Sequence, residues 1–137
     1  NEISINDDHI EMHYAEWDVR RIIYMDGISV PPNTQSSLLG YSTGHFEGPT
    51  LVVNTTHVNA GILSRMDHSD QLSAEERYTI SDDRQIMTLD VTFTDPWALN
   101  EPLTLKKIWK WSPDEEIYPY DDCEIPTDFI ESQGEKL

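Results

Sequence analysis

The chain has 137 residues, a formal net charge of −17 and a sequence pI near 4.3. This length fits a single domain that buries roughly two-thirds of its unfolded surface around one core. Only nine Lys and Arg residues are present. Each phosphate contact needs a basic side chain, so we do not expect nucleic acid or anionic membranes as partners. No apolar run approaches the roughly 18 residues of a membrane helix.

Three strands are predicted near the start of the chain. Residues 2–5 and 9–14 carry regularly placed apolar residues on either side of an Asn-Asp-Asp turn, which is typical of a hairpin. Residues 19–25 follow as a third strand. The period of two in a strand places Arg21 and Tyr24 on opposite faces of it.

The clearest hairpin in the sequence follows an extended loop that contains Pro31-Pro32. Residues 39–46 and 50–55 are rich in β-branched and aromatic side chains. Glu47-Gly48-Pro49 lies between them, where Gly tolerates a positive φ and Pro donates no ladder hydrogen bond. We therefore expect two antiparallel strands joined by a tight turn.

The second half of the chain adds further strands after a long irregular region at residues 58–71. Residues 72–81 and 103–111 are predicted strands, and 85–94 shows the best alternation, with four apolar residues on one face. Residues 116–120 form a possible last short strand.

Seven or eight short strands without a helical period predict an all-β fold. We expect an antiparallel, lipocalin-like barrel of about eight strands, because closure removes exposed edges and such a barrel can hold one small ligand. A β-sandwich is the alternative. The barrel would span residues 1–124 as one domain, followed by a polar C-terminal tail at 125–137.

Several segments together carry a family pattern: EWDVRRIIYMDG at 16–27, LLGYSTGHFEG and TLVV within 38–53, HSDQLSAEER at 68–77, and VTFTDPWAL at 91–99. In order and spacing they resemble a large bacterial family of exported, mostly uncharacterised proteins. The resemblance extends over residues 16–124. This sequence departs from the family pattern at His45-Phe46, where Arg-Trp is usual.

The resemblance implies a periplasmic or secreted protein and says little about activity. It also implies an upstream segment that often carries a cysteine. Cys123 is the single cysteine of this chain, so it cannot form an internal disulfide, and such a segment would offer it a partner.

The first group of candidate site residues lies in or beside the long loop. His68 could act as a general base and Asp70 could orient it, since His titrates near neutral pH. The alternative is that both side chains only cap the loop through backbone hydrogen bonds. His57, His68 and Asp70 could also supply three zinc ligands. No HExxH or CxxC spacing supports this, so no metal and no cofactor are expected.

The second group is centred on the third strand. Arg21 could bind a ligand oxygen, Trp17 could stack on an apolar ligand, and Tyr24 could polarise an oxygen in catalysis. Glu76 and Asp90 are candidate ligand-binding carboxylates. The alternative is that an arginine of this strand pairs with one of these two carboxylates to neutralise a buried charge.

Together these features predict an exported barrel that binds a small organic ligand in its cavity, with His57 in the ligand-binding set. The alternative is a metal-independent acid–base enzyme of the lyase, isomerase or hydrolase type. It would use His68, Asp70 and Tyr24 at the barrel mouth. We do not expect membrane insertion or nucleic-acid binding. The sequence does not decide whether the protein forms a homo-oligomer.

Overall fold

The computed structural model describes residues 2–15, 18–25, 27–63 and 66–115. Trp17, Cys123, the predicted strand at 116–120 and the predicted tail at 125–137 lie outside these residues. In the described ranges, no helix is long and apolar enough to cross a membrane. The regular structure of these described residues consists of ten β-strands in two sheets.

Eight strands form the main sheet, in the spatial order β1-β2-β3-β4-β5-β8-β9-β10. They are β1 (Glu2–Ile5), β2 (His9–Tyr14), β3 (Val19–Met25), β4 (Tyr41–Glu47), β5 (Thr50–Thr56), β8 (Ser73–Ile80), β9 (Ile86–Thr94) and β10 (Leu103–Lys110). Each agrees with a strand predicted from the sequence to within two residues at either end. The all-β prediction is therefore confirmed.

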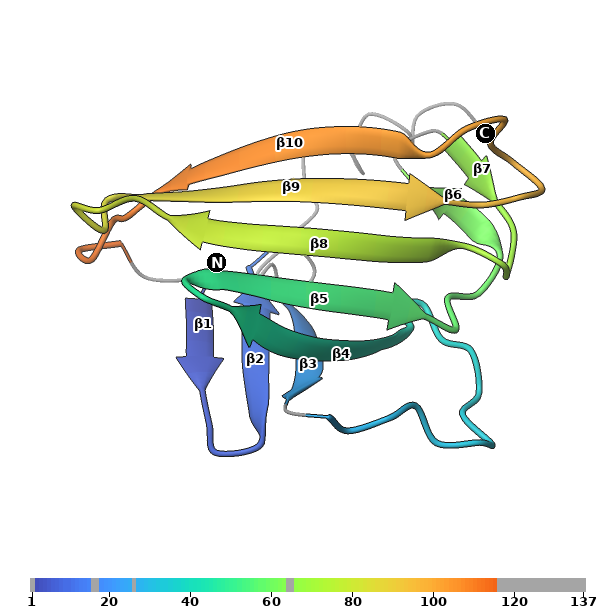
Figure 1. The fold of residues 1–137 in the computed structure, drawn as a ribbon, viewed down its shortest axis with the longest axis horizontal. Coiled ribbons are helices and arrows are strands. Elements are labelled where there is room, and N and C mark those ends of the chain that lie inside the picture. The colour runs from blue at the N-terminus through green and yellow to red at the C-terminus, as the bar shows by residue number, and fades with distance from the viewer. Residues whose placement is uncertain (1, 16–17, 26, 64–65, 116–137) are drawn as a thin grey trace, which may run out of the picture.

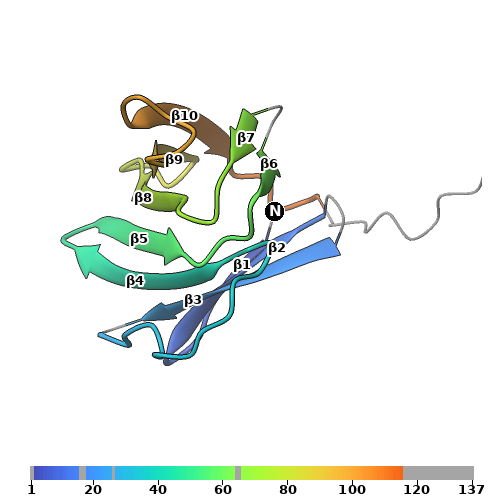
Figure 2. The same ribbon diagram turned by 90° about the vertical axis from the view of Figure 1, so that its right-hand side faces the viewer.

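The sheet is an open half-barrel, so the prediction of a closed barrel is wrong. It curls through 223° without closing, and β1 and β10 are its two edges. Figure 2 shows β8–β10 on one side, β1–β3 on the other, and β4 and β5 between them. In Figure 1, β1–β3 run across the direction of β8–β10. β1 is therefore not aligned to pair with β10, as closure requires.

The sheet is also mixed rather than fully antiparallel. β3 and β4 are parallel over only three register pairs, whereas β4 and β5 are antiparallel over seven. The connection at residues 27–40 brings the chain back so that Ser42 lies level with Ile23, and parallel neighbours need such a long crossover. Ser37 fixes this connection by accepting a hydrogen bond from the Asn59 N–H at 2.8 Å.

The region predicted to be irregular contains a small second sheet. β6 (Gly61–Leu63) and β7 (Met66–His68) form a separate antiparallel hairpin between β5 and β8. Strands of three residues are too short to show the alternation on which the sequence prediction depended.

The hydrophobic core lies on the inner face of the half-barrel. Its buried members come from five strands, and cross-strand rows such as Gly44–Val53–Glu76–Val91 align them. A Cβ at Gly44 would lie 2.8 Å from a methyl group of Ile23, so only glycine fits at that position. The buried cluster consists of Ile10, Met12, Ile23, Met25, Leu51, Val53, Tyr78, Leu89 and Val91.

The edge strand β10 carries an exposed hydrogen-bonding row. The Trp111 N–H donates to the Gln85 carbonyl at 2.8 Å. In the antiparallel register with β9, the backbone groups of the outward-facing residues of β10 therefore point away from β9. These residues include Lys106 and Lys110, and lysine on an edge strand opposes unwanted strand pairing.

We expect the double variant Lys106→Thr, Lys110→Thr to associate through β10, because it exposes a β-prone edge without its charges. The net charge changes from −17 to −17 − 2 = −19, which by itself favours the monomer. Light scattering over a concentration series measures the association. A variant that stays as monomeric as Thr88→Val, a substitution away from the edge, would contradict this role of the lysines.

Candidate functional site

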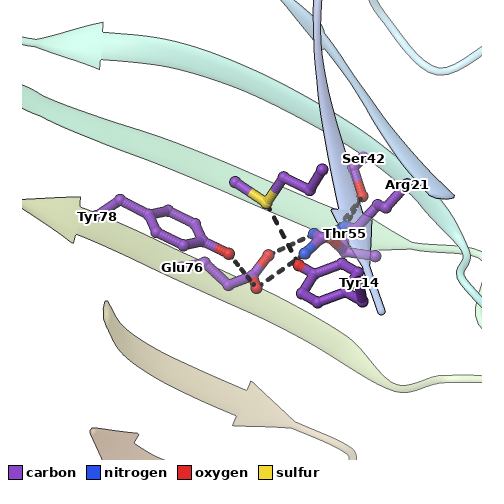
Figure 3. A network of polar contacts seen from close by, with 7 residues as sticks. Tyr14, Arg21, Ser42, Thr55, Glu76 and Tyr78 are labelled. Atoms are coloured by element: carbon purple, nitrogen blue, oxygen red, sulfur yellow. Dashed lines mark hydrogen bonds and ion pairs between the residues drawn. The ribbon is translucent and has the colours of Figure 1, made fainter. Parts of the chain in front are cut away.

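A buried ion pair crosses the inner face of the half-barrel between Arg21 of β3 and Glu76 of β8 (Figure 3). Nη1 of Arg21 donates to Oε1 of Glu76 at 3.0 Å, and Nη2 donates to Oε2. The two side chains are only 12% and 10% exposed. This bidentate geometry is the strongest form of an arginine–carboxylate contact.

Two hydroxyl groups from the intervening strands complete the surroundings of the guanidinium group. Nε of Arg21 donates to Oγ of Ser42 at 3.1 Å, and Nη2 donates to Oγ1 of Thr55 at 2.7 Å. The two hydroxyls lie 3.0 Å apart. Four of the five N–H donors of a guanidinium group therefore have partners, which leaves little capacity for a ligand.

Tyr78 extends this network on the β8 side. Its hydroxyl donates to Oε1 of Glu76 at 3.1 Å. Burial and the negative charge of Glu76 raise the pKa of Tyr78. Burial lowers the pKa of Arg21, but the hydrogen bonds and charge of Glu76 outweigh this and raise it overall. Tyr78 therefore stays protonated and Arg21 stays charged, which suits a fixed structural network better than proton transfer.

The sequence left open whether Arg21 binds a ligand or neutralises a buried carboxylate. In the structure Arg21 pairs with Glu76 and neutralises its buried charge. Ligand binding by Arg21 and Glu76 stays a prediction. Asp90 lies on the outer face, where its Oδ1 is 3.2 Å from Nζ of Lys106. It is therefore remote from the Arg21–Glu76 pair.

Among the described residues, the void found beside this network on the inner face is too small for a ligand. A void between β2 and β8–β10 measures only about 10 Å³ and is bounded by Tyr14, Tyr78, Trp109 and three aliphatic or methionine side chains. That volume is at the lower limit for a single water molecule. The core side chains fill the region where a lipocalin-like barrel would have its cavity.

The loop candidates do not converge on one another. Nδ1 of the buried His68 lies 3.2 Å from the Ser69 carbonyl oxygen, to which it can donate. Asp70 is exposed, and no hydrogen bond to His68 is found in the part of the chain that the structure describes. His57 has a positive φ of 58° and its Nδ1 lies 2.9 Å from Oγ1 of Thr56. The catalytic roles of His68 and Asp70 stay predictions.

Asp95 organises the loop instead, a role that the sequence did not predict. Its carboxylate is 1% exposed and accepts four hydrogen bonds, from the N–H and Oγ of Ser69 and from the N–H groups of Trp97 and Ala98. An Asp that accepts from the N–H groups two and three residues later is a common turn signal. The Asp95-Pro96 step carried that signal, but the contact with Ser69 is tertiary.

The outer face of the sheet carries the remaining candidate, Tyr24. Its ring stacks on Tyr41 of β4, with ring centroids 4.9 Å apart and an interplanar angle of 15°. Trp17 lies outside the described residues. Across the described ranges, no group of three or more His, Cys, Asp or Glu side chains could hold a metal ion.

A polar depression of about 310 Å³ lies close to this aromatic pair, where β5, β8 and β9 meet. By the register of the strands, six of its eight lining residues face outward. They offer four hydroxyl groups, an amide and a carboxylate. The lining residues are Asn54, Thr55, Thr56, Ser73, Ala74, Glu75, Thr92 and Thr94.

Comparison of the chain with family models, curated proteins and solved structures found no match. The structure supports the β-rich nature of the fold. Membership of the bacterial family that the motifs resemble stays a prediction.

We expect Glu76→Leu to destabilise the protein by about 3–5 kcal/mol, because Arg21 would keep a buried charge without its carboxylate. The double variant Arg21→Met, Glu76→Leu should recover most of that loss, since it removes both charges at similar volume. Urea unfolding of wild type, Arg21→Met, Glu76→Leu and the double variant measures the differences. A double variant as unstable as the sum of the two single variants would show that the pair is not coupled.

Asp95 should contribute to the pH dependence of stability. Burial raises the pKa of its carboxyl, but the four hydrogen bonds outweigh this and lower it overall. The stabilisation is therefore fully present above the ordinary Asp value of about 3.9 and is lost as the pH falls through the lower folded pKa. We expect the difference in unfolding free energy between wild type and Asp95→Asn to shrink on acidification below pH ~4. A difference that is constant across the acid range would contradict this role.

Proposed function

We propose that the protein binds a small polar organic molecule in the depression on the outer face of its sheet. The observation that carries this proposal is the polar lining of a depression of about 310 Å³, the size of a small ligand site. This keeps the ligand class expected from the sequence and moves the site from the interior to the outer face. The interior void of about 10 Å³ gives no comparable support.

The lining indicates the chemistry of the ligand. Hydroxyl groups both donate and accept hydrogen bonds, the Asn54 amide does the same, and the Glu75 carboxylate only accepts. The hydroxyls of Thr56, Ser73 and Thr92 each have one partner within the protein. A hydroxyl oxygen has two acceptor lone pairs, so a ligand rich in O–H or N–H donors can still bond to these groups. A net charge of −17 disfavours anionic ligands, so we propose a neutral or cationic molecule.

An acid–base enzyme has less support, because it depends on a contact between His68 and Asp70 that is not found in the described ranges. A periplasmic or secreted location stays part of the proposal. Two features support it: the resemblance of the motifs to exported proteins, and an acidic composition suited to an extracellular setting.

Amide chemical shifts of the labelled protein can test the site with four probes: glucose, inositol, glycine betaine and putrescine. We expect at least one probe to cause saturable shifts centred on Asn54, Ser73 and Thr92. Thr94→Val should weaken that binding by about 2- to 10-fold, the usual effect of losing one hydrogen bond.

Thr88→Val is the matched control, because Thr88 lies on the same face of β9 but outside the depression. It should bind as wild type does. The proposal fails if none of the four probes shifts these amides, or if Thr94→Val and Thr88→Val bind equally well.

A further inference from the structure

Two tyrosines adjoin the depression on the same face of the sheet. Tyr41 of β4 is the register partner of Thr56, which lines the depression. Tyr24 of β3 is level with Thr43, and Thr43 is the register partner of Asn54, another lining residue. Direct cross-strand partners have Cβ atoms about 4.5–5.5 Å apart, so the stacked rings border the polar groups.

The tyrosine pair retains exposed surface and polar capacity. Both rings are half-buried and stack on each other, which fixes their orientation. No hydrogen bond of either hydroxyl group is found within the described residues, so both can bond to a ligand. Burial and the neighbouring Tyr24 raise the pKa of Tyr41, so its hydroxyl remains a donor at neutral pH.

The polar row continues beyond the depression in a line across the strands. From Tyr24 the register runs through Thr43, Asn54, Glu75 and Thr92. Adjacent strands are about 4.8 Å apart, so these four steps cover roughly 19 Å. An elongated ligand that lies across the strands could contact the aromatic pair and the polar groups at once.

We propose that the ligand is a neutral carbohydrate chain, bound with a sugar ring against Tyr41 and Tyr24 and its hydroxyl groups in the depression. This inference rests on the proposed function and names its ligand class. A sugar ring has an apolar C–H face that packs on an aromatic ring, and hydroxyl groups around its edge. Oε1 of Glu75 lies 3.6 Å from Nη1 of Arg77, and this exposed carboxylate keeps lone pairs that can accept from sugar hydroxyls. Asn54 and the threonines can both donate and accept.

The charge of the protein restricts the class of ligand further. Acidic polysaccharides would meet a net charge of −17 and the Glu75 carboxylate, so they are disfavoured. A polyamine would suit that charge and could also contact the tyrosine rings through cation–π attraction. With few N–H groups, it would donate fewer hydrogen bonds than a sugar to the acceptor oxygens of the depression.

The test titrates the full chain with cellohexaose, maltohexaose and spermidine, followed by amide shifts and calorimetry. We expect at least one of the two oligosaccharides to cause saturable shifts along the row from Thr43 to Thr92. Tyr41→Ala should weaken this binding on the order of 10-fold, through lost stacking and apolar contact. Tyr41→Phe, which keeps the ring, should retain most of the affinity.

Phe46→Ala is the matched control, because Phe46 is an exposed aromatic residue on the same strand but at its other end. It should bind as wild type does, and circular dichroism shows whether each variant is folded. If Tyr41→Ala does not fold, Tyr24→Ala replaces it with the same expected loss.

The remaining outcomes separate the two proposals. Spermidine or one of the small amine probes binding at the depression, without either oligosaccharide, would overturn the carbohydrate inference and leave the binding site in place. No binding by any of these probes would overturn both. Oligosaccharide binding that is unchanged in folded Tyr41→Ala and Tyr24→Ala variants would overturn the aromatic platform.

Discussion

The ion pair between Arg21 and Glu76 is the interaction on which the rest of the structure depends. The two residues lie on β3 and β8, which are separated in the sheet by β4 and β5. Their side chains can meet only because the sheet curls and brings the inner faces of these strands together. A buried charge without a partner would be strongly destabilising, so the pair and its two hydroxyl partners hold the half-barrel in its curled form.

The same constraint accounts for the division of roles between the two faces. The inner face contains the apolar core and the satisfied polar network, and the void there is far too small for a ligand. The outer face keeps its hydroxyl groups, a carboxylate and a stacked tyrosine pair accessible. Binding on the outer face therefore does not compete with the packing that stabilises the fold.

The candidate site could be predicted from the sequence only where local pattern decides placement. Alternation in residues 19–25 placed Arg21 and Tyr24 on opposite faces, and the two residues do belong to different clusters. Alternation could not show that Arg21 reaches Glu76 or that Tyr24 stacks on Tyr41. Both contacts depend on the parallel pairing of β3 and β4 and on the curl of the sheet. The role of Asp95 was missed for the same reason, because Ser69 is distant in the sequence.

The sequence by itself determined the strands of the main sheet, their faces and the hairpin that became β4 and β5, because alternation and turn residues act over a few neighbouring positions. Tertiary structure alone decided that the sheet stays open, that β3 and β4 run parallel, and that the interior is filled. These properties depend on how far a sheet curls and on which side chains meet across it. No short stretch of sequence encodes that geometry.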